Sequence, residues 1–162
     1  MSKPKFTITD LFGNKIPFNK QKPLNYGFQG PIQVQTTPTR TSLSLETQVA
    51  KLLLSGQPKQ ATHVQFTAAC ITVAKHTFNN KTKSYTPKHP KQNALGQYTV
   101  SEPIPISTKA TDLQMHLELP ITEPLANTTA LMVALGITFG TLENKQFIDL
   151  LTGKAMNIVK IV

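Results

Sequence analysis

The side chains best suited to chemistry lie in a lysine-rich stretch in the middle of the chain. Residues 75–91 contain five lysines and no acidic residue, and Phe78 and Tyr85 stand among the lysines. Lysine ammonium groups bind phosphate oxygens, and exposed aromatic rings stack on unpaired bases. We therefore predict a nucleic-acid contact here. Its residues are Lys75, Lys81, Lys83, Tyr85, Lys88 and Lys91.

The type of cation limits how well such a contact can recognise base sequence. Arg40 is the single arginine of the chain, whereas bidentate recognition of guanine favours arginine. We therefore expect weak, sequence-indifferent and salt-sensitive binding. The alternative is that the stretch faces solvent, a neighbouring subunit or an acidic protein.

No other combination of residues predicts catalysis, a metal or a cofactor. The histidines lack the spacing and the neighbouring ligands typical of zinc sites; they are His63, His76, His89 and His116. The sequence contains neither a G-x-S-x-G nucleophile elbow nor a glycine-rich phosphate loop. Cys70 is alone in an apolar run, which indicates a buried, unreactive thiol. The chain is therefore not expected to be an enzyme.

Composition favours β structure. The 162 residues include 22 Thr, 11 Ile and 8 Val, and 39% of the chain is hydrophobic. Side chains branched at Cβ lose rotamer freedom in helices and fit the surface of a sheet. The length suits one domain with one hydrophobic core.

Charge is distributed unevenly along the chain. Residues 1–99 carry thirteen basic and two acidic side chains, whereas residues 100–162 carry four and six. A field of one sign attracts polyanions at long range. The same pattern also fits an ordinary lysine-rich, soluble surface.

The first 31 residues predict an extended arm. Four prolines and three glycines interrupt this segment, which excludes a long helix or a central strand. Its large apolar side chains predict that it lies on its own domain or on a neighbouring subunit. We propose five aromatic residues as assembly anchors: Phe6, Phe12, Phe18, Tyr26 and Phe28.

Residues 32–162 predict a single β-sandwich domain. Residues 32–36 and 113–119 alternate between apolar and polar, and residues 129–139 are nearly all apolar, which is typical of a central strand. Further strands are expected near 64–73, 98–106, 146–151 and 156–162, with a long basic loop over 76–97. The spacing of Leu45, Val49, Leu52 and Leu53 predicts one short helix over residues 44–56. Seven or eight strands favour a jelly-roll-like antiparallel sandwich.

The last thirty residues suggest a relationship. An apolar run over 131–139, a turn near Asn144 and a closing run over 154–162 resemble the C-terminal strands of virion structural proteins from tailless icosahedral bacteriophages. In that family these strands complete a jelly roll in a capsid protein. The resemblance implies a structural role and supplies no catalytic residue.

These observations favour a virion structural protein, such as a minor or vertex capsid subunit, that assembles with copies of itself or with other capsid proteins. No run is apolar and long enough for a signal peptide or a membrane span, so we expect synthesis in the host cytoplasm. One alternative is a non-structural protein that binds single-stranded nucleic acid. Another is a viral matrix or movement protein. No small-molecule substrate is expected.

Overall fold

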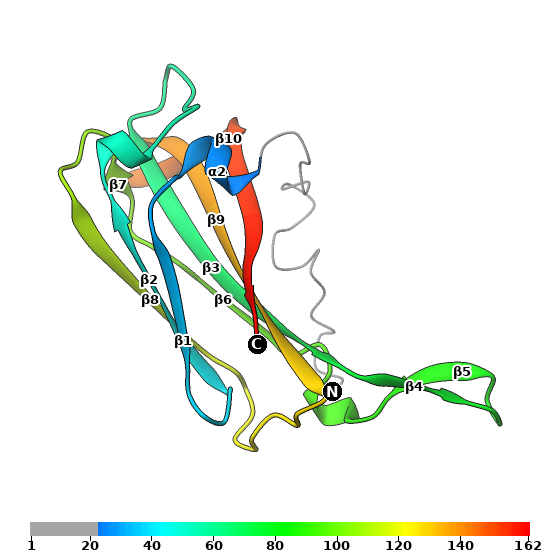
Figure 1. The fold of residues 1–162 in the computed structure, drawn as a ribbon. Coiled ribbons are helices and arrows are strands. Elements are labelled where there is room, and N and C mark those ends of the chain that lie inside the picture. Colours follow the sequence, from blue (N-terminus) through cyan, green and yellow to red (C-terminus); the bar gives the residue numbers. More distant parts are fainter. Residues whose placement is uncertain (1–22) are drawn as a thin grey trace.

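The computed structural model describes residues 23–162, which are mainly β and form a sandwich-like pair of antiparallel sheets (Figure 1). The smaller sheet has the order β1 (Ile32–Thr36), β2 (Ser42–Val49) and β8 (Thr111–Glu118). The larger sheet has the order β10 (Gln146–Ile161), β9 (Thr129–Glu143), β3 (His63–Ala74) and β6 (Gly96–Val100), with β7 (Ile104–Pro105) also beside β3. The β-rich composition predicted this class, while the jelly-roll connectivity stays a prediction.

The remaining elements are short. β4 (His76–Asn79) and β5 (Ser84–Pro87) form a separate two-stranded hairpin. The helical pieces of the described chain are α2 (Leu24–Gly27) and the 3₁₀ turns η2 (Lys51–Leu53) and η3 (Pro90–Gln92).

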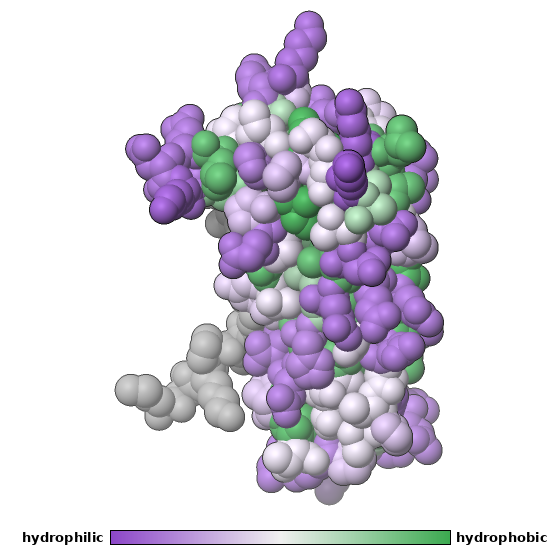
Figure 2. Space-filling model, turned by 90° about the vertical axis from the view of Figure 1, so that its left-hand side faces the viewer, coloured by the Kyte–Doolittle hydropathy of each residue, from purple (hydrophilic) through white to green (hydrophobic). Residues whose placement is uncertain are grey.

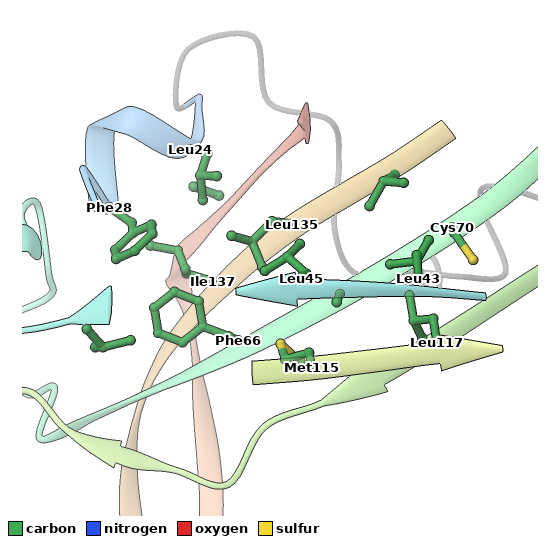
Figure 3. Packing of buried hydrophobic residues seen from close by; sticks show 14 of the residues in the cluster. Leu24, Phe28, Leu43, Leu45, Phe66, Cys70, Met115, Leu117, Leu135 and Ile137 are labelled. Carbon is green, nitrogen blue, oxygen red and sulfur yellow. The ribbon is translucent and has the colours of Figure 1, made fainter. Parts of the chain in front are cut away.

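The core fills the space between the two sheets (Figure 3). Leu45 of β2, Phe66 of β3 and Leu135 of β9 point into it and have no exposed surface. Alternation along each strand produces this arrangement, because successive side chains point to opposite faces of a sheet. Each fully buried side chain of this size contributes about 1.5–3 kcal/mol through the hydrophobic effect.

The secondary structure differs from the sequence prediction at β2. The expected helix over residues 44–56 is wrong, because residues 42–49 form a strand between β1 and β8. Leu43, Leu45 and Val49 alternate with polar residues and are buried. The same leucines fit helical spacing, but pairing with strands on both sides satisfies the backbone of this segment better than a solitary helix would. Only η2 is helical in this region.

The last strand is also longer than expected. The sequence predicts two separate strands over residues 146–151 and 156–162. Instead β10 is one strand, whose pairing with β9 shifts register between Asp149 and Lys154. Asp149 and Lys154 also form an ion pair across this irregularity. The extra residues are therefore taken up as a bulge.

The described end of the predicted arm belongs to the domain. α2 lies against β9 and β10, and the Leu24 N–H donates to Asn157 Oδ1 at 3.2 Å. Leu24 and Phe28 are 3% and 2% exposed, and the Phe28 ring meets Phe66 edge to face at 5.0 Å. Phe28 is thus a core residue of its own domain and not an anchor on a neighbour.

The outer face of the smaller sheet is hydrophilic, as Figure 2 shows for this side of the molecule. Every side chain that points outward from the three strands is polar. These residues are Gln33 and Gln35 of β1, Ser42, Ser44, Glu46 and Gln48 of β2, and Asp112, Gln114, His116 and Glu118 of β8. This sheet therefore has one face for the core and one for water.

Candidate functional site

The lysine-rich stretch folds as a hairpin that projects from the body of the protein (Figure 1). β4 and β5 pair from His76 opposite Pro87 to Asn79 opposite Ser84. All four residues of β4 are exposed, and neither strand pairs with a strand of the two sheets. The sequence predicts a loop over 76–97, but more than half of these residues lie in β4, β5, η3 and the start of β6.

Local hydrogen bonds shape the tip of the hairpin. The Asn79 Oδ1 accepts the N–H of Lys81 at 2.9 Å, and the hydroxyl groups of Thr82 and Ser84 lie 2.8 Å apart. Lys83 adopts a left-handed conformation with φ of 52°. Lys81 and Lys83 are both exposed in this turn, so two of the predicted lysines lie at the tip.

An aromatic pair occupies the middle of the hairpin. Phe78 and Tyr85 lie opposite each other, with ring centroids 5.2 Å apart and an interplanar angle of 62°. Tyr85 is 71% exposed and Phe78 is 49% exposed. Thr77 and Thr86 pair on the opposite face. One side of the hairpin is therefore aromatic and the other is polar.

The root of the hairpin is fixed to the body. The Lys88 N–H donates to the Lys75 carbonyl at 2.7 Å, and the Lys75 N–H donates to the Thr128 carbonyl at 3.1 Å. The Ala74 N–H donates to Asn93 Oδ1 at 3.0 Å. Lys75 and Lys88 thus begin and end the hairpin, and the aromatic pair lies between two pairs of lysines.

Gln92 ties the segment after the hairpin to the loop before β9. Its side chain is buried; the Nε2 donates to the Pro124 carbonyl at 3.1 Å, and the Oε1 accepts the Ala126 N–H at 2.8 Å. The Thr129 hydroxyl also donates to that Oε1 at 3.2 Å. Sequence reasoning missed Gln92, because a single glutamine in a polar loop gives no sign of burial.

Arg40 binds the same loop from the other side. Its guanidinium donates to the carbonyls of Ala126 and Thr129 at 2.7 Å and of Val162 at 3.0 Å. The only arginine in the sequence is therefore engaged inside the fold. This leaves lysine as the cation available to a partner of the hairpin.

The predicted nucleic-acid residues are brought together in part. Lys75, Lys81, Lys83, Tyr85 and Lys88 belong to the hairpin or its root, whereas Lys91 lies in η3 beyond it. All five predicted lysines are exposed.

The predicted assembly anchors separate into three groups. Tyr26 is 53% exposed and Phe28 is buried. Phe6, Phe12 and Phe18 lie outside the described residues.

The other potentially reactive or metal-binding side chains of the described chain form no site. Burial raises the pKa of the Cys70 thiol from 9.0 to about 11, against a smaller lowering by a backbone hydrogen bond at Gln97. Within residues 23–162, no three His, Cys, Asp or Glu side chains are placed to hold a metal ion. In the same range, no helix is long and apolar enough to cross a membrane.

Comparisons with protein families, with curated proteins and with solved structures find no match to this chain. The hairpin and the surfaces of the two sheets are therefore the features of residues 23–162 that bear on function.

Proposed function

We propose that this chain is a virion structural protein, a capsid subunit that acts by assembling with further copies of itself or with other capsid proteins. The C-terminal resemblance to phage virion proteins and the β-rich, sandwich-like body support this proposal. The observation that carries it is the projecting hairpin with its exposed aromatic pair.

A hairpin of this kind needs a partner. Two strands alone are only marginally stable in water, and edges without a neighbour leave backbone N–H and C=O groups unpaired. Aromatic side chains are enriched at protein interfaces, and tyrosine is among the residues that most often dominate the binding energy. Phe78 and Tyr85 shield each other in part, yet most of the Tyr85 ring stays in water. Docking of this face on a neighbouring subunit would bury both rings.

Sedimentation velocity on the full chain tests the proposal. The wild type is expected to form oligomers or closed particles as its concentration rises, and the Phe78→Ser/Tyr85→Ser variant is expected to stay monomeric. Both substitutions lie outside the core, so the body keeps its fold. Leu52→Ser is the matched control, because Leu52 is 94% exposed on the body. A wild type that is monomeric at every concentration would refute assembly with further copies of the chain. A double variant that assembles normally would refute the role of the hairpin.

A second candidate function is sequence-indifferent binding of single-stranded nucleic acid. The arrangement of lysines favours it: cations at the tip and at the root flank the exposed Tyr85 ring, and the segment has no acid to oppose them. Lysines can follow a phosphate backbone while a ring stacks on a base. In a virion this contact would face the genome.

Fluorescence anisotropy with a single-stranded oligonucleotide, at roughly 50 and 200 mM salt, tests the second candidate. Each phosphate contact contributes about 0.7 to the slope of log affinity against log salt concentration. Lys81→Gln/Lys83→Gln should therefore lower the slope by about 1.4. Lys51→Gln/Lys59→Gln removes the same charge from the body and should change the slope less. Affinity that does not depend on salt would rule out this function.

A further inference from the structure

A groove lies along one side of the sandwich, between β6 and β8. Each of these strands is the end strand of its sheet, and within residues 23–162 the two do not pair with each other. Residues 99–102 and 104 line the groove on the side of the larger sheet, and residues 111–116 line it on the side of the smaller sheet. Its volume is about 400 Å³, which is within the range of about 300–1,000 Å³ for pockets that bind small ligands. The groove is therefore large enough to take aromatic side chains.

Apolar side chains provide part of the groove surface. Ile104 and Leu113 are partly buried and pack against the main core, and Met115 is itself a core residue. Val100, which also lines the groove, is 44% exposed. The free energy falls when another apolar group covers surface of this kind, because water is released from it. The groove thus offers an apolar surface to a partner.

Two acidic side chains border the groove, one from each side. Glu102 follows β6 and Asp112 lies in β8, and both are exposed. The lining contains no lysine or arginine. Since the chain has only eight acidic residues against seventeen basic ones, the groove has the opposite sign of charge to the molecule as a whole. It therefore attracts a basic partner and repels phosphate groups.

The hairpin carries the complementary groups. Its aromatic side presents Phe78 and Tyr85, which are 49% and 71% exposed. Lys83 is two residues from Tyr85, or about 7 Å along the strand. Rings that enter the groove would cover its apolar side chains, while Lys81 and Lys83 at the tip would meet the carboxylates at its border.

The hairpin does not reach the groove of its own molecule. It follows β3 and projects from the body, and its root is fixed by the hydrogen bond from Lys75 to Thr128 (Figure 1). Thr67, which pairs with Val100 beside the groove, lies eleven residues before Phe78. Eleven extended residues span about 36 Å. The hairpin that can enter the groove is therefore that of a second copy.

We propose that the groove between β6 and β8 binds the hairpin of a second copy, with the aromatic pair over its apolar side chains and the tip lysines beside Glu102 and Asp112. This inference rests on the proposed assembly function, because it names the surface to which the hairpin binds. The contact joins two different surfaces, so each copy binds one neighbour through its hairpin and another through its groove. Contacts of this head-to-tail kind close into rings or extend into filaments.

Reversing the charge of each surface tests the inference by sedimentation velocity on the full chain. Glu102→Lys/Asp112→Lys makes the groove basic, and Lys81→Glu/Lys83→Glu makes the hairpin tip acidic. Each variant alone brings like charges together, which should raise the concentration needed for assembly by about tenfold or more. All four side chains are exposed, so circular dichroism should show that both variants are folded.

A mixture of the two variants should restore assembly. In the mixture the basic hairpin of one variant meets the acidic groove of the other, and the acidic hairpin meets the basic groove. Glu118→Lys/Glu123→Lys is the matched control, since it changes the net charge equally at exposed residues that do not line the groove. This control should assemble like the wild type.

The outcomes separate this inference from the function on which it rests. Normal assembly of Glu102→Lys/Asp112→Lys would overturn the groove as the binding surface and leave the assembly function standing. The same holds for a mixture that stays monomeric at concentrations at which the wild type assembles. A wild type that is itself monomeric would refute assembly with further copies, and this inference with it.

Photo-crosslinking locates the contact without any change of charge. With p-benzoylphenylalanine in place of Phe78, we expect crosslinks to residues 99–104 or 111–116 of a second copy. Trypsin releases these segments in separate peptides, 92–109 and 110–145, which mass spectrometry distinguishes. Crosslinks confined to other segments, or none at concentrations at which the wild type assembles, would overturn the inference.

Discussion

Replacing the half-buried Arg40 by methionine should destabilise the domain more than replacing any single exposed charged side chain. The guanidinium donates to four backbone carbonyls, at 2.7 Å for Thr129 and Ala126, 3.0 Å for Val162 and 3.4 Å for Leu125. These carbonyls belong to the loop before β9, the start of β9 and the last residue of the chain. One side chain in the turn between β1 and β2 thus joins the two sheets at their common end.

The expected loss of stability depends on which hydrogen bonds each carbonyl oxygen still accepts after the substitution. The Ala126 oxygen still accepts the Thr129 N–H at 2.9 Å, and the Val162 oxygen still accepts the Leu131 N–H at 2.8 Å. The 3.4 Å bond to Leu125 is long and contributes little. Charged hydrogen bonds contribute about 1.5–3 kcal/mol each, and part of this is recovered through the remaining partners and water. We expect a net loss of about 2–3 kcal/mol, which corresponds to roughly 4–12 °C in Tm.

Urea unfolding followed by circular dichroism measures this loss. The midpoint should fall without a change in slope, because the native and unfolded states expose the same surface as before. Arg40→Lys should recover part of the loss, since an ammonium group reaches fewer carbonyls than the planar guanidinium. Lys59→Met removes one charge from an exposed site and is the control. A loss below about 0.5 kcal/mol, the ordinary range of surface substitutions, would refute the reasoning.

Three further predictions concern buried groups. Because the Cys70 pKa is about 11 in the fold against 9.0 ordinarily, the unfolded state loses this proton first, so the free energy of unfolding should fall by about 2 kcal/mol between pH 9 and 11. Urea titrations should show no such contribution in Cys70→Ala, and a decline of equal size in that variant would contradict the assignment. Gln92→Leu leaves the Ala126 N–H without its acceptor and should cost about 2–3 kcal/mol in the same assay, whereas a neutral result would mean that water replaces the side chain. Gly140→Ala puts a Cβ against the Ile148 carbonyl and should lower Tm as the strands move apart, and an unchanged Tm would show that β10 adjusts without cost.

The sequence predicted those strands whose hydrophobic pattern fits a strand and not a helix. β1 and β8 alternate strictly, and β9 is a long apolar run, so each was placed to within a few residues. β2 failed because Leu45 and Val49 fit both a helix and a strand. The pairing with β1 and β8, which decides between the two, is made by residues far away in the sequence.

Composition predicted where the candidate site lies in the sequence, but it did not predict that the segment folds as a hairpin. Lysines among aromatic residues marked the segment, yet its strands lack an apolar alternation because neither face of the hairpin meets the core. The polar residues that fix its surroundings, Gln92 and Arg40, could not be found from the sequence, because their partners are backbone carbonyls and amides. Such contacts depend on the final fold and on no side-chain pattern.

We propose that the exposed face of the hairpin binds another copy of the chain. Replacing Tyr85 by the photo-crosslinking residue p-benzoylphenylalanine and irradiating the purified protein tests it directly, because the ring is 71% exposed. We expect a covalent dimer whose crosslink joins position 85 to a peptide of a second molecule, and the same label at Leu52 should give none. A sample that remains monomeric after irradiation, at concentrations where the wild type is fully soluble, would contradict the claim.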